Sequence, residues 1–225
     1  VTDVKELKKS AIIAGSIGNN IIIDTLIINK RIDVSDIKER RECYKIQVVE
    51  NPYKGIEKAI IIVGSDKRGT MYGIYYISEL IGVSPWSYFG DVVPEKKSEL
   101  IFDENDLNFT SKEPSVKYRG FFLNDEWPSL GSWVTNSFGD FNEEFYEKIF
   151  QLILRLKGNF MWPAMWSAVF SENGKSNPLA NAKLADTYGI VMGTSHHESM
   201  FRSGEEWKKI NNCLLYTSDA ADDSL

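Results

Sequence analysis

Apolar and polar positions alternate in blocks along the second half of the chain. Short apolar runs at about residues 116–124, 159–161 and 189–193 predict three strands. Each run ends in polar or aromatic residues, which is the arrangement of a (β/α)-barrel, where functional groups follow the carboxyl ends of the strands. A complete barrel needs about eight strands and roughly 250 residues. Residues 115–212 are therefore predicted to form the first, incomplete part of a (β/α)8 TIM barrel.

The segment between the first two predicted strands has the clearest helical pattern. Its apolar residues recur at spacings of three and four, which predicts a helix over residues 141–157 with one apolar stripe. Asp140 is the expected N-cap, Glu143 completes a looser form of the capping box, and Gly158 is expected to end the helix. The stripe comprises Phe141, Phe145, Ile149, Leu152, Ile153 and Leu156.

Strand and helix patterns also alternate in residues 1–110, which are predicted to form a small α/β domain. Strands are expected at residues 10–15, 44–50 and 59–64. The last is a continuous apolar run, mostly β-branched, of the kind that is buried on both faces of a mixed or parallel sheet. A helix is favoured over a strand at about residues 18–29, because the segment lies between two strand-like runs.

A second helix in this domain is expected to run from Thr70, its predicted N-cap, to about Leu80, with Gly82 at the C′ position. The polar segment 105–114 is the expected boundary between the two domains. Residues 213–225 carry no pattern that continues a barrel and are predicted to be a non-native or disordered tail.

Composition narrows the class of partner. The formal net charge is −6 and no basic face is indicated, which argues against nucleic acid and anionic membrane as partners. No apolar run reaches the ~18 residues of a membrane span, and Cys43 and Cys213 provide no disulfide framework. The chain shows no signal peptide but begins with Val1, so a secreted or periplasmic location stays open for the full-length protein.

The first predicted barrel strand ends in Asn124, Asp125 and Glu126. Neighbouring side chains on a strand point to opposite faces, so at most one of the two carboxylates should enter the mouth of the barrel directly. Cleavage of a glycosidic bond typically uses two carboxylates on either side of the bond. Either residue can therefore supply one member of such a pair or hold substrate, and the alternative is that both are solvated loop charges.

The other two strand ends carry the remaining candidates. His196 and His197 are the only histidines in the chain, and with Glu198 they can hydrogen-bond a sugar or a carboxylate, bind a metal, or form a structural pair. Trp162 and Trp166 fit a sugar-binding mouth, because a pyranose presents a C–H face to an aromatic ring, although such side chains more often fill cores.

Two basic residues precede the second helix of the N-terminal domain. Lys67 and Arg68 could contribute to a site for an anionic group at the helix N-terminus. An ordinary capped turn explains the same residues equally well.

Five segments are distinctive when taken together, and two of them, NFMWPAMW at 159–166 and GIVMGTSHHE at 189–198, are long and unusual. The others are residues 65–75, 81–86 and 120–127. With them the chain resembles the family-115 glycoside hydrolases, the xylan α-1,2-glucuronidases. The resemblance implies a small N-terminal α/β domain followed by a (β/α)8 barrel. It also implies release of glucuronic acid, or its 4-O-methyl form, from xylan with inversion.

Two stretches depart from the pattern of that family. Residues 87–90 stand where the family tends to have more Trp, and residues 171–174 stand where an acidic pair is more usual. The family pattern therefore gives no support for a carboxylate role at Glu172. At least one catalytic carboxylate is expected beyond residue 225, so the chain by itself is expected to be inactive.

The resemblance and the strand ends together lead to one assignment of roles. Glu126 is expected to line the active site as a catalytic carboxylate, with Asp125 as its neighbour. Xylan or a xylo-oligosaccharide is the expected substrate, no cofactor or metal is expected, and a homodimer is one arrangement open to the full-length protein. The expected substrate-binding residues are His196, His197, Glu198, Trp162, Trp166, Asn124, Lys67 and Arg68.

Two other classes of protein stay open on the residues alone. One is a metal-dependent barrel hydrolase that uses His196, His197 and Glu198, and the other is a non-catalytic carbohydrate-binding protein.

Overall fold

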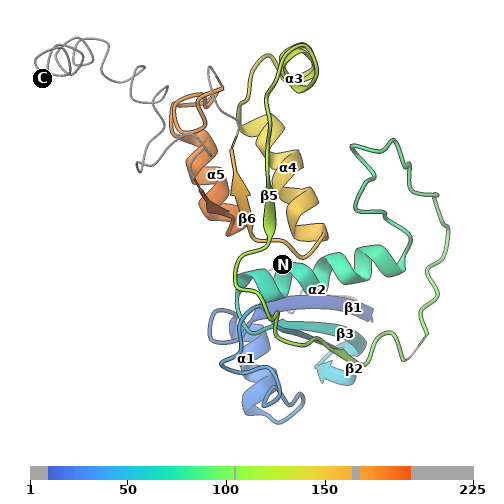
Figure 1. Cartoon of the computed structure of the whole chain (residues 1–225). Helices are drawn as coiled ribbons and strands as arrows, with labels where there is room; N and C mark the ends of the chain where they lie inside the picture. Colours follow the sequence, from blue (N-terminus) through green and yellow to red (C-terminus); the bar gives the residue numbers. More distant parts are fainter. Residues whose placement is uncertain (1–9, 104, 164–167, 194–225) are drawn as a thin grey trace, which may run out of the picture. The chain divides into compact units, whose positions relative to one another are not determined.

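The computed structural model describes residues 10–103, 105–163 and 168–193. The chain divides into two compact units, each with its own sheet (Figure 1). Among the described residues, the first unit comprises those of 10–117 together with Leu154–Lys157, and the second comprises Tyr118–Ile153 and those of 158–193. None of the helices in the described residues is long and apolar enough to cross a membrane.

The first unit is built on a four-stranded mixed sheet. Its elements are β1 (Ser10–Ser16), α1 (Ile21–Ile28), β2 (Tyr44–Tyr53), β3 (Ile56–Gly64), α2 (Lys67–Leu80) and β4 (Phe109–Thr110). The strand order is β1-β3-β2-β4, with β1 parallel to β3 and the other pairs antiparallel. The predicted strands and the helix favoured at 18–29 are confirmed.

Helices cover both faces of this sheet, with α1 on one side and α2 on the other (Figure 1). Adjacent residues of β3 show why. Ile61 belongs to the apolar cluster that also holds Ile23 and Leu26 of α1, whereas Ile62 lies against Gly73 of α2. Both isoleucines are fully buried, so the prediction that this strand is buried on both faces is confirmed.

Helix α2 begins earlier than predicted. Its N-cap is Asp66, whose Oδ1 accepts a hydrogen bond from the Gly69 N–H at 2.8 Å, so the prediction of Thr70 as the cap is wrong. Thr70 lies inside the first turns, and its hydroxyl is 2.7 Å from that of Ser16. At the other end Gly82 has φ +95° and donates its N–H to Glu79, as a C′ glycine does.

The second unit is built on a three-stranded parallel sheet. Its elements are β5 (Gly120–Phe122), α3 (Leu130–Phe138), α4 (Glu143–Arg155), β6 (Phe160–Trp162), α5 (Ala180–Tyr188) and β7 (Val191–Met192). The strand order is β5-β6-β7, and β5 and β7 are shorter than their predicted apolar runs, whereas β6 is shifted by one residue. A parallel sheet with helical connections is common to barrels and open sheets, so barrel closure stays a prediction.

Helix α3 was not predicted from the sequence. Its apolar positions, Leu130, Val134 and Phe138, recur every fourth residue, which is a weak signal over only nine residues. The helix nevertheless lies in the connection between β5 and α4, and its Val134 is fully buried.

Helix α4 confirms most of its predicted apolar stripe. Five of the six stripe residues are buried, but Leu156 lies beyond the helix end and is 46% exposed, so its assignment was wrong. Tyr146, Phe150 and Leu154 are also fully buried, because the helix packs on more than one side. The chain turns at Lys157, which has φ +59°, rather than at the predicted Gly158.

The N-terminus of α4 also differs from the prediction. Asn142 Oδ1 accepts hydrogen bonds from the N–H groups of Glu144 at 3.0 Å and Phe145 at 3.3 Å, so Asn142 is the cap. Asp140 instead accepts from the Phe141 N–H and from the Asn173 amide. Asp140 therefore does not cap α4, and Glu143 forms no capping box with it.

We expect Asn142→Ala to lower the free energy of unfolding by about 1–2 kcal/mol, because two N–H groups of α4 lose their acceptor. The measurement is the midpoint of chemical denaturation at an unchanged m-value. Asn136→Ala, at an exposed position of α3, is the matched control and should shift the midpoint little. Equal midpoints for the two variants would contradict the assignment of the cap.

Candidate active site

The carboxyl ends of the three parallel strands lie level with one another in the second unit. Phe122 is in register with Trp162, and Met161 is in register with Met192. Beyond the strands, the Leu123 N–H donates to the Trp162 carbonyl at 2.9 Å and the Gly193 N–H donates to the Met161 carbonyl at 2.8 Å. Residues that directly follow the strands therefore gather at one edge of the sheet.

The two carboxylates after β5 have different surroundings. Asp125 is 2% exposed, whereas Asn124 and Glu126 are exposed. Leu123, two residues before Asp125, is also buried, so the expected alternation of faces continues past the end of the strand. Glu126 and Asn124 are thus the side chains that a ligand can reach, while Asp125 is enclosed by protein.

The first turn of α3 holds the backbone at Glu126. The Glu126 carbonyl accepts a hydrogen bond from the Ser129 hydroxyl at 3.0 Å and a longer one, at 3.4 Å, from the Gly131 N–H. A Cβ at Gly131 would lie 2.5 Å from the Trp127 indole, so glycine is needed for that ring to pack there. These supports were missed from the sequence because α3 itself was missed.

Trp162 presents an accessible indole at the end of β6. The side chain is 43% exposed, and its ring stands perpendicular to that of Phe160 with 5.0 Å between centroids. A Cβ at Gly193 would lie 2.6 Å from Trp162 Cδ1, so the absence of a side chain there makes room for the indole. An aromatic ring whose position is fixed by its neighbours and whose surface is partly exposed is suited to packing against a sugar.

Lys67 and Arg68, the two candidate binding residues of the first unit, lie in the first turn of α2. Arg68 Nε donates to Glu42 Oε1, and the Glu42 side chain is fully buried. Asp66 accepts hydrogen bonds from the N–H groups of both Glu42 and Gly69. The N-terminus of α2 is therefore a capped turn with Asp66 as the cap, and a role for Lys67 or Arg68 in binding an anionic group stays a prediction. Lys67 is exposed.

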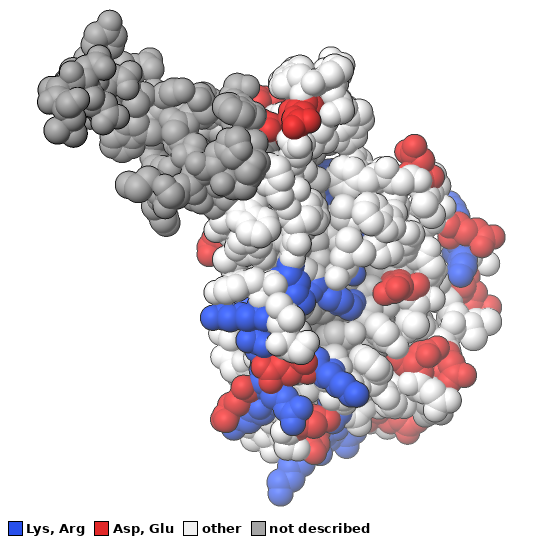
Figure 2. Space-filling view, in the orientation of Figure 1, with Lys and Arg blue, Asp and Glu red and all other residues white. Residues whose placement is uncertain are grey.

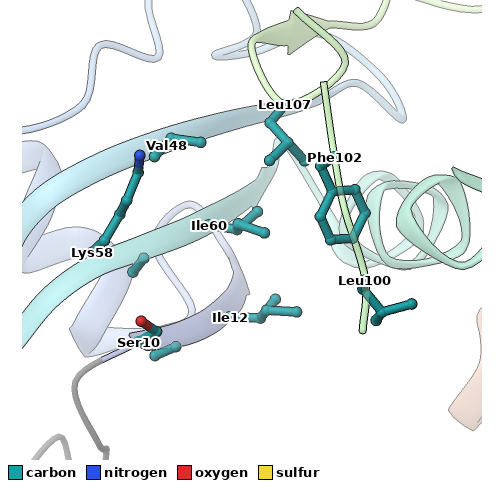
Figure 3. Close-up of a pocket in the computed structure, with 10 residues that line it drawn as sticks. Ser10, Ile12, Val48, Lys58, Ile60, Leu100, Phe102 and Leu107 are labelled. Carbon is teal, nitrogen blue, oxygen red and sulfur yellow. The ribbon is translucent and has the colours of Figure 1, made fainter. Parts of the chain in front are cut away.

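A cavity of about 570 Å³ lies in the first unit, on the face of the sheet formed by Ile12, Ile60 and Val48 (Figure 3). Leu100 and Phe102 form its other wall, and Lys58 is the one ionisable side chain in the lining. The groove holds no carboxylate, so its lining lacks the groups that cleave a glycosidic bond.

Trp166, His196, His197 and Glu198 lie outside the described residues, and their roles stay predictions. Within residues 10–103, 105–163 and 168–193, no group of three or more His, Cys, Asp or Glu side chains is placed to hold a metal ion. Basic and acidic side chains are interspersed on the face shown in Figure 2.

An exposed carboxylate and an accessible indole that follow neighbouring parallel strands are compatible with a carbohydrate-active α/β enzyme. Comparison with known proteins specifies the family. Residues 111–222 match the model of glycosyl hydrolase family 115, a range that includes most of the segment predicted to be a non-native tail. The chain belongs to glycoside hydrolase family 115.

A similar solved structure is that of BtGH115A, described as a novel family GH115 4-O-methyl-α-glucuronidase with specificity for decorated arabinogalactans. It is 36% identical to this chain with a TM-score of 0.66, and the match covers 82% of this chain. The chain spans only 23% of the length of that protein. No curated protein matches the chain.

Proposed function

We propose that the whole protein is a glycoside hydrolase that removes glucuronic acid, or its 4-O-methyl form, from the side chains of a plant polysaccharide. The observation that carries this proposal is the placement of Glu126, Asn124 and Trp162 at one edge of a parallel sheet in a chain of family 115. The relative acts on decorated arabinogalactans by its description. Xylan and arabinogalactan are therefore both candidate carriers of the uronic acid.

The proposed mechanism inverts the anomeric carbon. Such a reaction needs a general acid and a water-activating base, with carboxyl groups about 6.5–9.5 Å apart. We assign Glu126 as one of the two, because it is the exposed carboxylate of the strand end. Asp125, being buried, supports the loop that carries Glu126.

The other predicted residues divide between two parts of the substrate. Trp162 packs against a sugar ring, and Asn124 hydrogen-bonds its hydroxyls. His196 and His197 bind the uronate, for which imidazole is suited as a donor at neutral pH. Lys67 and Arg68 lie in the other unit, where Arg68 pairs with Glu42, and a role for either in binding the substrate stays a prediction.

The test is product analysis. The whole protein, incubated separately with glucuronoxylan and with a glucuronate-decorated arabinogalactan, is expected to release the free uronic acid from at least one of them. Proton NMR of the first product formed should show the anomer opposite in configuration to the substrate linkage, because inversion is a single displacement. Release of no uronic acid from either polymer would contradict the proposed activity, and the retained anomer would contradict the mechanism alone.

A further inference from the structure

We propose that the second unit holds a separate subsite for a neutral sugar of the polysaccharide, in a cleft of about 370 Å³ between the α3–α4 junction and the loop after β6. The cleft is lined by Phe138, Asp140, Glu172 and Lys175, together with two buried asparagines. The identity of the polysaccharide rests on the proposed function, whereas the presence of the subsite does not.

The cleft opens at the same end of the sheet as the candidate active site. Strands β5 and β6 are parallel, so α4, which connects them, runs back against the strand direction and begins near their carboxyl ends (Figure 1). The loop that contains Glu172 and Lys175 leaves β6 at that end. A polysaccharide whose uronic acid side chain lies at the strand ends can therefore extend toward this cleft.

Hydrogen bonds between the α3–α4 junction and the loop after β6 hold the cleft in shape. The Asn173 amide donates to Asp140 Oδ1 at 2.8 Å. Glu143 accepts hydrogen bonds from the backbone N–H groups of Lys175 at 2.6 Å and Ser176 at 2.8 Å. A preformed site is what tight ligand binding favours, because little ordering is left to be done when the ligand binds.

Glu143, the acceptor in two of these hydrogen bonds, is ionised at neutral pH. Partial burial alone would raise the pKa of Glu143, but the hydrogen bonds from the backbone of Glu143, Lys175 and Ser176 outweigh it and lower the pKa to about 2. A lowered folded-state pKa means that the contribution of Glu143 to stability is present above the unfolded value of 4.5 and is lost as the pH falls toward about 2. Glu143 is therefore ionised, and able to accept these hydrogen bonds, at neutral pH.

The chemistry of the lining selects a neutral, hydroxyl-rich ligand. Carboxylates such as those of Asp140 and Glu172 accept hydrogen bonds from sugar hydroxyls, and the half-buried ring of Phe138 offers an apolar surface to a sugar C–H face. Phe138 is held by edge-on contacts with Trp133 and Phe145, at 5.7 and 5.6 Å between centroids.

Charge distinguishes this ligand from the uronic acid itself. The lining carries two carboxylates and one ammonium group, and that ammonium, Lys175 Nζ, already lies 2.6 Å from Glu144. A cleft with a net negative charge disfavours a ligand that carries a carboxylate of its own, because like charges repel at close range. The subsite is accordingly suited to an uncharged xylose, arabinose or galactose unit.

The test is calorimetric binding to the whole protein of two neutral probes, xylotetraose and a β-1,3-linked galactotriose, which separate xylan from arabinogalactan as the source of the sugar. At least one probe is expected to bind. Glu172→Ala should weaken that binding by about tenfold or more, because a hydrogen bond to a charged acceptor is lost. Phe138→Leu, which keeps an apolar side chain against Trp133 and Phe145 and removes the flat ring, should also weaken it.

Glu99→Ala, at an exposed loop position of the first unit, is the matched control and should leave the affinity unchanged. Failure of both probes to bind would overturn the proposal, as would binding that is unaffected in both Glu172→Ala and Phe138→Leu. Probe binding that depends on these residues, in a protein that releases no uronic acid, would retain the subsite and refute the proposed activity.

Discussion

Glu126→Gln in the whole protein is expected to lower kcat for uronic acid release by on the order of 10²-fold or more, if Glu126 transfers a proton in the reaction. Glutamine keeps the shape of the side chain and its backbone supports, but it neither gives nor takes a proton at the pH of the assay. Because the Glu126 side chain is exposed, the substitution should leave the unfolding midpoint nearly unchanged. Steady-state kinetics with a small glucuronide and with polymer are the measurement.

The distribution of the effect between the kinetic constants identifies the role. A loss in kcat indicates chemistry, whereas a rise in KM with kcat unchanged indicates that Glu126 only holds substrate. Glu99→Gln makes the same chemical change at an exposed position in the other unit and serves as the control. Turnover of Glu126→Gln within about threefold of the parent would show that the end of β5 is not where the bond is cleaved.

Arg68→Ala is expected to lower the free energy of unfolding by about 3 kcal/mol, the low end of the range for removing one partner of a buried ion pair. The Glu42 side chain is fully buried, so without this guanidinium its charge is left in the protein interior, whereas Arg68 retains 26% exposure. Denaturant titration followed by tryptophan fluorescence and by circular dichroism is the measurement. A folded variant whose only defect is weaker uronate binding would instead support Arg68 as a substrate ligand.

Two further variants make the test specific. Lys67→Ala, at the exposed neighbouring position, should stay within about 0.5 kcal/mol of the parent. Glu42→Gln combined with Arg68→Ala should recover part of the loss, because the double variant removes the buried charge as well as its partner. Additive losses in the double variant would mean that the two residues do not stabilise each other.

The pattern of apolar residues alone was enough to predict those helices and strands whose buried face follows from residues close together in the sequence. The continuous apolar run at residues 59–64 predicted a strand buried on both faces, and Ile61 and Ile62 are fully buried there. The stripe of α4 predicted its core face except at Leu156. The alternation rule also predicted that Asp125 and Glu126 would have opposite surroundings, because successive strand side chains point to opposite sides.

Local chemistry was ambiguous wherever two neighbouring residues could play one role. Asp66 and Thr70 are both good N-caps, as are Asp140 and Asn142, and spacing cannot choose between them. Tertiary hydrogen bonds decide each case. Asp66 also accepts from the Glu42 N–H, and Asp140 is used by Asn173 instead. Short α3 was missed because one buried face over nine residues is too little pattern to recognise.

Tertiary structure alone decided the roles that depend on residues distant in the chain. Arg68 pairs with Glu42, which lies 26 positions earlier in the chain and has a fully buried side chain. The cleft at Asp140 and Glu172 exists because the loop after β6 folds back on the α3–α4 junction, a contact that no periodicity encodes. The sequence by itself determined most of the elements, though not α3, together with the family resemblance and the strand-end carboxylates, because each depends on residues within a few positions of one another. Long-range packing decided which side chains are accessible to solvent and which charged side chains are paired with an opposite charge.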